Sequence, residues 1–254
     1  MEKKLIEKYI NLLHQFYQKY QKEIREREVG VMLSGGIDSS IITYFTASYF
    51  PKTLFFTLAS DEKSEDVFCA KILAKKLKKN LEIIFYQKED VSKIRKKVEE
   101  ILIKNKVEVN PMQTALASAF FLVCQKAKEK NIDFLFTGQG PDILLAGYHK
   151  YKNIKKEKLN EEIKKDLPLL EVDKKRDSSI SNFFKIKLIN PYLEKDFVDF
   201  ALEIPENLKI NLINNEVYEK YLSRKVGEFL QLPKEIILRH KKALQYSTKI
   251  IKKI

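Results

Sequence analysis

One short segment, SGGIDSS at positions 34–40, combines the residue types needed to hold phosphate groups. Two adjacent glycines, Gly35 and Gly36, let the backbone turn tightly and bring its N–H groups against an anion. The serine hydroxyls add further donors. The carboxylate of Asp38 would repel a phosphate, but it suits a Mg²⁺ ion that bridges phosphate oxygens. We therefore predict a phosphate-binding loop formed by Ser34, Gly35, Gly36, Asp38, Ser39 and Ser40.

A second glycine-containing segment, TGQGPDILLAGY at positions 137–148, follows the apolar run 134–136. A helix is expected to begin near Pro141, because proline is favoured in the first helical turn. Asp142 could then face the first loop across the carboxyl ends of a parallel sheet, where open α/β folds bind ligands. The chain has 7 glycines, and five of them fall in these two segments: Gly35, Gly36, Gly138, Gly140 and Gly147.

Apolar runs and helical apolar spacing alternate along the first part of the chain. A short continuous apolar run suits a strand that is buried on both faces, as in a parallel sheet. Strands are expected at 29–33, 53–58, 81–86 and 134–136, with helices at 5–27, 41–50, 65–78, 91–103 and 112–130. This alternation predicts an α/β fold with a doubly wound, mostly parallel sheet.

Beyond Tyr151 the strand signal fades, and breaks near several prolines separate segments that look helical. We therefore expect an α/β nucleotide-binding domain over residues 1–151. Residues 152–254 are expected to form a helical extension that packs back on the nucleotide site, within one structural unit.

Composition limits the class of protein. The formal net charge is +13, but the basic residues are dispersed, which favours a solvated lysine-rich surface over a nucleic-acid partner. Cys69 and Cys124 lack the paired spacing of a zinc site, and no apolar run is long enough to span a membrane. A cytoplasmic location without a membrane partner is expected. The patterns GxxxxGK[ST] and GxGxxG are both absent, which disfavours transfer of a γ-phosphate and nicotinamide chemistry.

The first loop resembles the SGGxDS signature of the PP-loop ATP pyrophosphatases, an adenine-nucleotide alpha-hydrolase-like fold. The second segment is similar to the SGEGxDExxGGY segment in the synthetase domain of asparagine synthetases and β-lactam synthetases. Three further stretches agree with this family in its order. They are Phe56-Thr57-Leu58, then Arg176-Asp177 with Asn190-Pro191-Tyr192-Leu193, and finally residues 232–236 with 239–246.

The resemblance implies a role for individual residues. Asp38 and Asp142 would coordinate Mg²⁺, and Leu33, Leu58 and Gly138 would contact the adenosine of ATP through their backbones. Lys241 would stabilise charge on the α-phosphate and the pyrophosphate as the bond between them breaks. The implied activity is that of an AMP- and pyrophosphate-forming ligase, which adenylates a carboxylate and transfers an amine to it. Aspartate is one candidate for that carboxylate.

Several positions depart from the family pattern. Gln139 replaces a catalytic glutamate, and a carboxamide cannot accept a proton as a carboxylate does. Ile143 replaces a second glutamate, and Ala146 replaces a glycine. Lys187 and Ile189 stand where the family has Glu and Arg. The motifs that would bind the nucleotide are therefore intact, whereas those that would bind the acceptor carboxylate have diverged.

The nitrogen source and two other functions stay open. Glu2 follows Met1, where glutamine-using relatives carry a cysteine nucleophile, so ammonia, a separate glutaminase subunit or a different amine is expected to supply the nitrogen. A PP-loop tRNA-modifying enzyme is favoured by the net charge but not by the cysteine spacing. A non-catalytic nucleotide-binding relative is favoured by Gln139 and Ile143.

Overall fold

A computed structural model describes residues 1–240 and 250–253 of the chain. The elements that precede the second glycine loop are α1 (Glu2–Ile24), β1 (Val29–Met32), α2 (Ile37–Tyr49), β2 (Thr53–Ala59), α3 (Glu65–Leu77), β3 (Asn80–Phe85), α4 (Lys88–Lys104), α5 (Pro111–Glu129) and β4 (Phe134–Phe136). The later ones are α6 (Pro141–Leu144), η1 (His149–Asn153), α7 (Lys156–Asp166), α8 (Pro168–Phe183), β5 (Lys187–Ile189), η2 (Pro191–Leu193), α9 (Lys195–Glu203), α10 (Glu206–Lys209), β6 (Ile210–Ile213), β7 (Glu216–Glu219), α11 (Tyr221–Phe229), α12 (Lys234–Ile237) and η3 (Ile250–Lys253).

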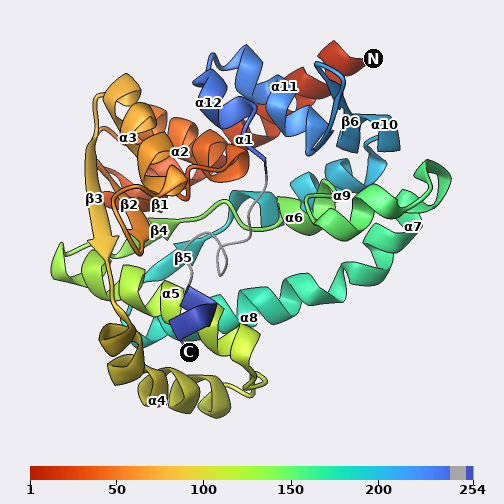
Figure 1. Ribbon diagram of the computed structural model, residues 1–254. Coiled ribbons are helices and arrows are strands. Elements are labelled where there is room, and N and C mark those ends of the chain that lie inside the picture. The colour runs from red at the N-terminus through yellow and green to blue at the C-terminus, as the bar shows by residue number, and fades with distance from the viewer. Residues whose placement is uncertain (241–249, 254) are drawn as a thin grey trace.

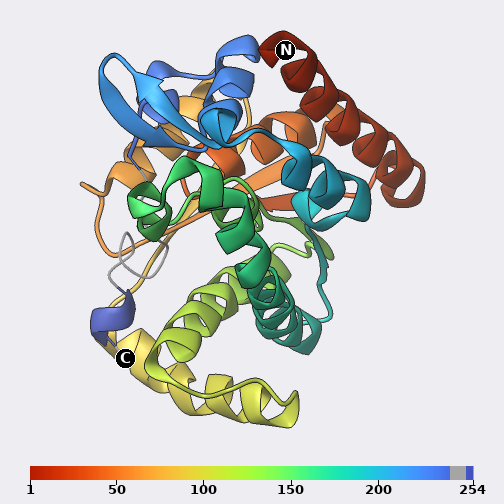
Figure 2. The same ribbon diagram turned by 90° about the vertical axis from the view of Figure 1, so that its right-hand side faces the viewer.

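The central sheet has five strands in the order β3-β2-β1-β4-β5, and every pairing is parallel. Helices α1, α2 and α3 lie on one side of it and α4, α5 and α8 on the other (Figures 1 and 2). The predicted doubly wound α/β fold is therefore confirmed. The strand order reverses between β1 and β4, and the two glycine loops leave the carboxyl ends of these two neighbouring strands.

Side chains that alternate along each strand supply a separate core on each face of the sheet. In β2, Phe55 packs into the core with α1, α2 and α3, whereas Phe56 packs into the core with α4 and α5. In β4, Phe136 joins the first core and Leu135 the second. Because successive side chains enter opposite cores and both cores are apolar, the strands are apolar along their whole length.

The region beyond Tyr151 was expected to be mostly helical, but its described residues also contain three strands. β5 pairs with β4 and completes the main sheet, while β6 and β7 form an antiparallel hairpin. β5 spans only Lys187–Ile189, which is too short to show a periodic pattern. The hairpin turns at Asn214 and Asn215, which both have positive φ, and asparagine is favoured in such turns. A turn signal was thus present in the sequence.

None of the helices within residues 1–240 and 250–253 is long and apolar enough to cross a membrane. Both cysteines are buried free thiols. Burial raises the pKa of Cys69 and of Cys124, so neither has the character of a reactive thiolate.

Candidate functional site

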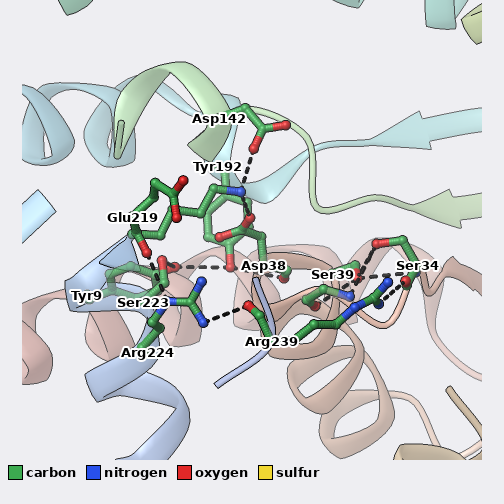
Figure 3. A network of polar contacts seen from close by, with 12 residues as sticks. Tyr9, Ser34, Asp38, Ser39, Asp142, Tyr192, Glu219, Ser223, Arg224 and Arg239 are labelled. Atoms are coloured by element: carbon green, nitrogen blue, oxygen red, sulfur yellow. Dashed lines mark hydrogen bonds and ion pairs between the residues drawn. The ribbon is translucent and has the colours of Figure 1, made fainter. Parts of the chain in front are cut away.

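The first glycine loop connects the end of β1 to the start of α2, and it is closed by its own serines (Figure 3). The backbone N–H of Ser34 donates to Oγ of Ser39 at 3.2 Å, and Oγ of Ser39 donates to the carbonyl of Gly36 at 3.1 Å. The two serine hydroxyls also share a hydrogen bond of 3.0 Å. Gly36 is the N-cap of α2, so the unpaired N–H groups in the first turn of that helix lie next to the loop.

The two loop glycines differ in what requires them. Gly35 has φ of +70°, and a Cβ built there would lie 2.7 Å from Cβ of Cys69 and 2.9 Å from Nη1 of Arg239. Gly36 has an extended backbone, and a Cβ built there would meet only Oγ of Ser34 at 3.5 Å. Gly35 is therefore needed for the shape of the loop. Gly36 is not, but its missing side chain keeps the cavity in front of the loop open.

Replacing each glycine by alanine separates these two requirements. Gly35→Ala is expected to lower the free energy of unfolding by about 1–3 kcal/mol, because both the backbone and the contacts oppose the methyl group. Gly36→Ala is expected to leave the unfolding midpoint within about 0.5 kcal/mol of the wild type while weakening ATP binding at least about tenfold. Denaturant titration and calorimetric ATP binding measure the two effects. Equal destabilisation by both variants would contradict this assignment.

The second glycine loop leaves β4 and touches the first loop through its backbone. A Cβ on Gly138 would lie 2.7 Å from both N and Cα of Ser39, so glycine alone allows the two loops to approach this closely. Pro141 begins α6, as its position in the sequence predicts. The contact brings Asp142 from one loop toward Asp38 from the other.

Asp38 and Asp142, both labelled in Figure 3, share one buried cation, which is the ammonium group of Lys220. Nζ of Lys220 contacts Oδ2 of Asp38 and lies 2.5 Å from Oδ1 of Asp142. Lys220 connects β7 to α11 with a left-handed φ of 56°, and only 4% of it is exposed. Burial alone would lower the pKa of Lys220, but Asp142 and Asp38 outweigh this effect and raise its pKa, so the group stays charged.

Two buried arginines hold the elements around this site. Arg224 on α11 donates to the carbonyl of Glu219 at 2.9 Å, to that of Arg239 at 3.0 Å and to that of Ile237. It thereby joins the turn that carries Lys220 to the segment that carries Arg239. Arg239 in turn pairs with Asp66 on α3 and donates to the carbonyl of Ser34 at 3.1 Å.

A third set of contacts fixes the backbone of Asp38. The hydroxyl of Tyr192 donates to the carbonyl of Asp38 at 3.2 Å. The hydroxyl of Tyr9 on α1 donates to Tyr192 at 3.1 Å and shares a bond of 3.3 Å with Ser223 on α11. Helices from both ends of the chain therefore position the first loop.

The two loops open into a cavity of about 850 Å³, within the range of small-molecule sites. Most of the predicted site residues line it: Leu33, Ser34, Gly36, Asp38, Ser39, Leu58, Gly138, Gln139 and Asp142. Gly35 and Ser40 do not line it, and the Ser40 hydroxyl is fully buried without a hydrogen-bond partner among the described residues. Lys241 lies outside the described residues.

The wall beyond Gln139 contains a buried ion-pair cluster. On α8, Nε of Arg176 lies 2.7 Å from Asp177 and Nη1 lies 2.6 Å from Asp173. Nη1 also donates to Oε1 of Gln113 at 3.1 Å. Burial raises the pKa of Asp177 to about 6, against the opposing effects of Arg176 and Gln139. This cluster ties α5, α8 and the second loop together at one end of the cavity.

The positions that depart from the family pattern separate into two groups. Gln139 and Ile143 line the cavity, and Ile143 is buried there. Lys187 instead pairs with Glu23 on the surface, Ile189 is buried beside β4, and Ala146 is buried and does not line the cavity. Only the first group can affect a bound molecule directly.

Sequence reasoning missed Lys220, Arg224 and the site role of Arg239. Lysines are mostly exposed in folded proteins, and nothing in the local sequence distinguishes Lys220 from the others. Its partners Asp38 and Asp142 are far away along the chain. The sequence did offer a signal for Arg239, because it begins the segment 239–246 that resembles the family.

The two carboxylates fit a Mg²⁺ site that is completed by a nucleotide. Mg²⁺ is usually held by one or two carboxylates together with substrate phosphates and water. Asp38 and Asp142 already surround one cation, and Oδ1 of Asp38 is buried without a hydrogen-bond partner among the described residues. No group of three or more His, Cys, Asp or Glu side chains in the described part of the chain is placed to hold a metal alone.

Comparison with known proteins gives the family. The model of the asparagine synthase family matches residues 20–182 and 169–252. A putative glutamine-hydrolyzing asparagine synthetase from Methanocaldococcus jannaschii is 30% identical over 200 residues, covering 75% of this chain and 35% of that protein. The glutamine-hydrolyzing asparagine synthetase of Rattus norvegicus is 27% identical over 231 residues, covering 86% of this chain and 39% of that protein.

The chain spans between 35% and 39% of the length of these two curated relatives. Among solved structures, the NMN synthetase of Francisella tularensis aligns with a TM-score of 0.45 and 16% identity, covering 94% of this chain and 74% of that one. At these values the structural likeness adds nothing to the assignment. The family match covers both glycine loops and nearly all of the chain, and the chain belongs to the asparagine synthase family.

Proposed function

We propose that the chain is an ATP-dependent, AMP- and pyrophosphate-forming ligase that adenylates a carboxylate and transfers an amine to it. The observation that carries this proposal is the meeting of two glycine loops at the carboxyl ends of β1 and β4, with Asp38 and Asp142 around one cation. Such a place binds ligands in open α/β sheets.

ATP would lie across the two loops. Its outer phosphates would face the first loop, where the α2 N-terminus and the serine hydroxyls offer donors. The adenosine would lie toward Leu33, Leu58 and Gly138, which line the cavity. The Leu33 N–H and carbonyl are already bonded to Phe56 and Thr57, which fixes the position of this wall.

Asp38 and Asp142 would hold Mg²⁺, which when bound would neutralise phosphate charge. Lys220 and Arg239 are paired with aspartates and would offset the negative charge that Asp38, Asp142 and Asp66 present to the phosphates. Lys241 would stabilise charge on the α-phosphate and the pyrophosphate. Because the phosphates are already anionic and gain charge as the bond breaks, fixed cations lower the barrier.

The reaction would run in two steps. A carboxylate oxygen of the acceptor attacks the α-phosphorus, and the bond to the β-phosphate oxygen breaks to release pyrophosphate. An amine nitrogen then attacks the acyl carbon, AMP leaves, and a proton passes to solvent. Gln139 can donate from its amide to the acyl group, but it cannot take that proton. Ammonia, or ammonia from a separate glutaminase subunit, is the proposed nitrogen source.

Exchange of labelled pyrophosphate into ATP tests the proposal. We expect exchange only when a carboxylate is added, and transfer of ¹⁸O from the labelled carboxylate to AMP once ammonium is present. ATP binding without exchange for any carboxylate would instead favour a non-catalytic nucleotide-binding relative. Exchange that requires tRNA rather than a carboxylate would favour a tRNA-modifying enzyme.

A further inference from the structure

The cavity extends along much of α5. Met112 and Val123 both line it from the same face of α5, and they are separated by about 16 Å along the helix axis. Val123 belongs to the same core cluster as Leu58, which the adenosine is proposed to contact. Met112 lies at the other end, next to Gln113 of the Arg176 cluster.

The Met112 end of the cavity has an apolar edge, which we call the apolar rim. It consists of Met112 on α5 with Leu169 and Val172 on α8, which are 49%, 46% and 40% exposed. Leu169, Val172 and Arg176 recur on one face of α8 at helical spacing. Exposed apolar side chains gathered at the mouth of a cavity mark a surface that binds an apolar group.

The charges at this end do not favour a second carboxylate. Arg176 is the arginine that lines it, and Asp173 and Asp177 already pair with its guanidinium. The cluster therefore carries no net positive charge. The other lysines and arginines lining the cavity, among the described residues, also have partners: Lys150 with Asp166, Lys220 with Asp38 and Asp142, Arg239 with Asp66, and Arg224 with three carbonyls.

We propose that the acceptor is a monocarboxylic acid whose body beyond the reacting carboxylate is apolar, rather than a dicarboxylic acid such as aspartate. This inference rests on the proposed adenylating function. The reacting carboxylate would lie near Gln139 and Asp142, and the apolar body would extend toward Ile143, Leu116 of α5 and the rim, all of which line the cavity. A second carboxylate placed there would face Asp173, and each described lysine or arginine that lines the cavity already has a partner, so its burial would be costly.

Pyrophosphate exchange with a matched set of acids tests this inference. Hexanoate, phenylacetate, leucine and phenylalanine are compared with succinate, aspartate and glutamate, under identical conditions. We expect kcat/KM for at least one apolar acid to exceed that for every dicarboxylate by at least tenfold. Aspartate, glutamate or succinate performing as well as the best apolar acid would overturn the inference while leaving the proposed function in place. No exchange with any acid, despite ATP binding, would overturn the proposed function and this inference with it.

A pair of valine variants tests the rim directly. Val172→Asp places a charge on the rim, and we expect it to raise KM for the apolar acid at least tenfold with KM for ATP unchanged. Val109→Asp is the matched control, because Val109 is 39% exposed and does not line the cavity. Both positions are exposed, so both variants are expected to fold, which thermal melting verifies. An unchanged acceptor KM in Val172→Asp would also overturn the inference.

Discussion

Asp38→Asn is expected to lower carboxylate-dependent pyrophosphate exchange by at least about a thousandfold, or ~4 kcal/mol of transition-state stabilisation. The substitution keeps the size and shape of the side chain, but it removes the negative charge that would hold the metal. Asp38 is 8% exposed, its Oδ2 contacts Lys220, and its backbone is fixed by Tyr192. The loop is therefore expected to keep its position, and the effect should fall on the chemistry.

Asp133→Asn is the matched control, since Asp133 is an exposed aspartate paired with Lys128 at 2.9 Å. We expect it to change exchange by less than about twofold, because exposed ion pairs contribute little. Steady-state exchange kinetics over a range of Mg²⁺ concentrations make the comparison. Wild-type rates in Asp38→Asn at limiting Mg²⁺ would mean that this carboxylate does not hold the metal.

Lys220→Met is expected to have the second large effect, on both stability and activity. Methionine keeps most of the apolar length but leaves Asp38 and Asp142 as two neighbouring carboxylates without their cation. Removing one partner of a buried ion pair costs about 3–5 kcal/mol, so we expect a loss of that size in the free energy of unfolding. Pyrophosphate exchange should fall at least about a hundredfold, because a fixed charge near the phosphates is lost.

Added Mg²⁺ distinguishes this explanation from a general loss of packing. Because a divalent cation can take the place of the ammonium between the two carboxylates, Mg²⁺ should raise the melting temperature of Lys220→Met more than that of the wild type. Lys195→Met, a change at an exposed pair with Asp199, serves as the control and should show neither effect. A Lys220→Met protein with wild-type stability and no added response to Mg²⁺ would refute the shared-cation arrangement.

The sequence predicted the main sheet well because its strands are buried on both faces. Such strands must be apolar along their length, so runs like those of β1 and β2 stand out from the amphipathic helices. β5 was not predicted, because a three-residue edge strand with one lysine is too short to show an alternation of apolar and polar residues. Its place in the sheet is fixed by its pairing with β4 and not by its own residues.

The site could be predicted where backbone geometry demands particular residues. A positive φ requires glycine at position 35, and the close approach of two backbones requires glycine at position 138, so both positions can be recognised in the sequence. Lys220 has no such local requirement. Its burial depends on two carboxylates brought together by the fold and on Arg224, which holds its turn through backbone carbonyls. Local sequence patterns do not reveal contacts between side chains that are far apart along the chain. They also do not reveal contacts between a side chain and distant backbone atoms.

The late position of β5 in the chain has a consequence during synthesis on the ribosome. A nascent chain that has completed β4 but not yet reached Ile189 presents the backbone N–H and C=O groups along one side of β4 as an open sheet edge. Unpaired apolar edges of this kind are sites of association between chains. Translation through residues 137–189 is therefore the interval in which newly made copies are most exposed to aggregation, and in which a chaperone would protect them most.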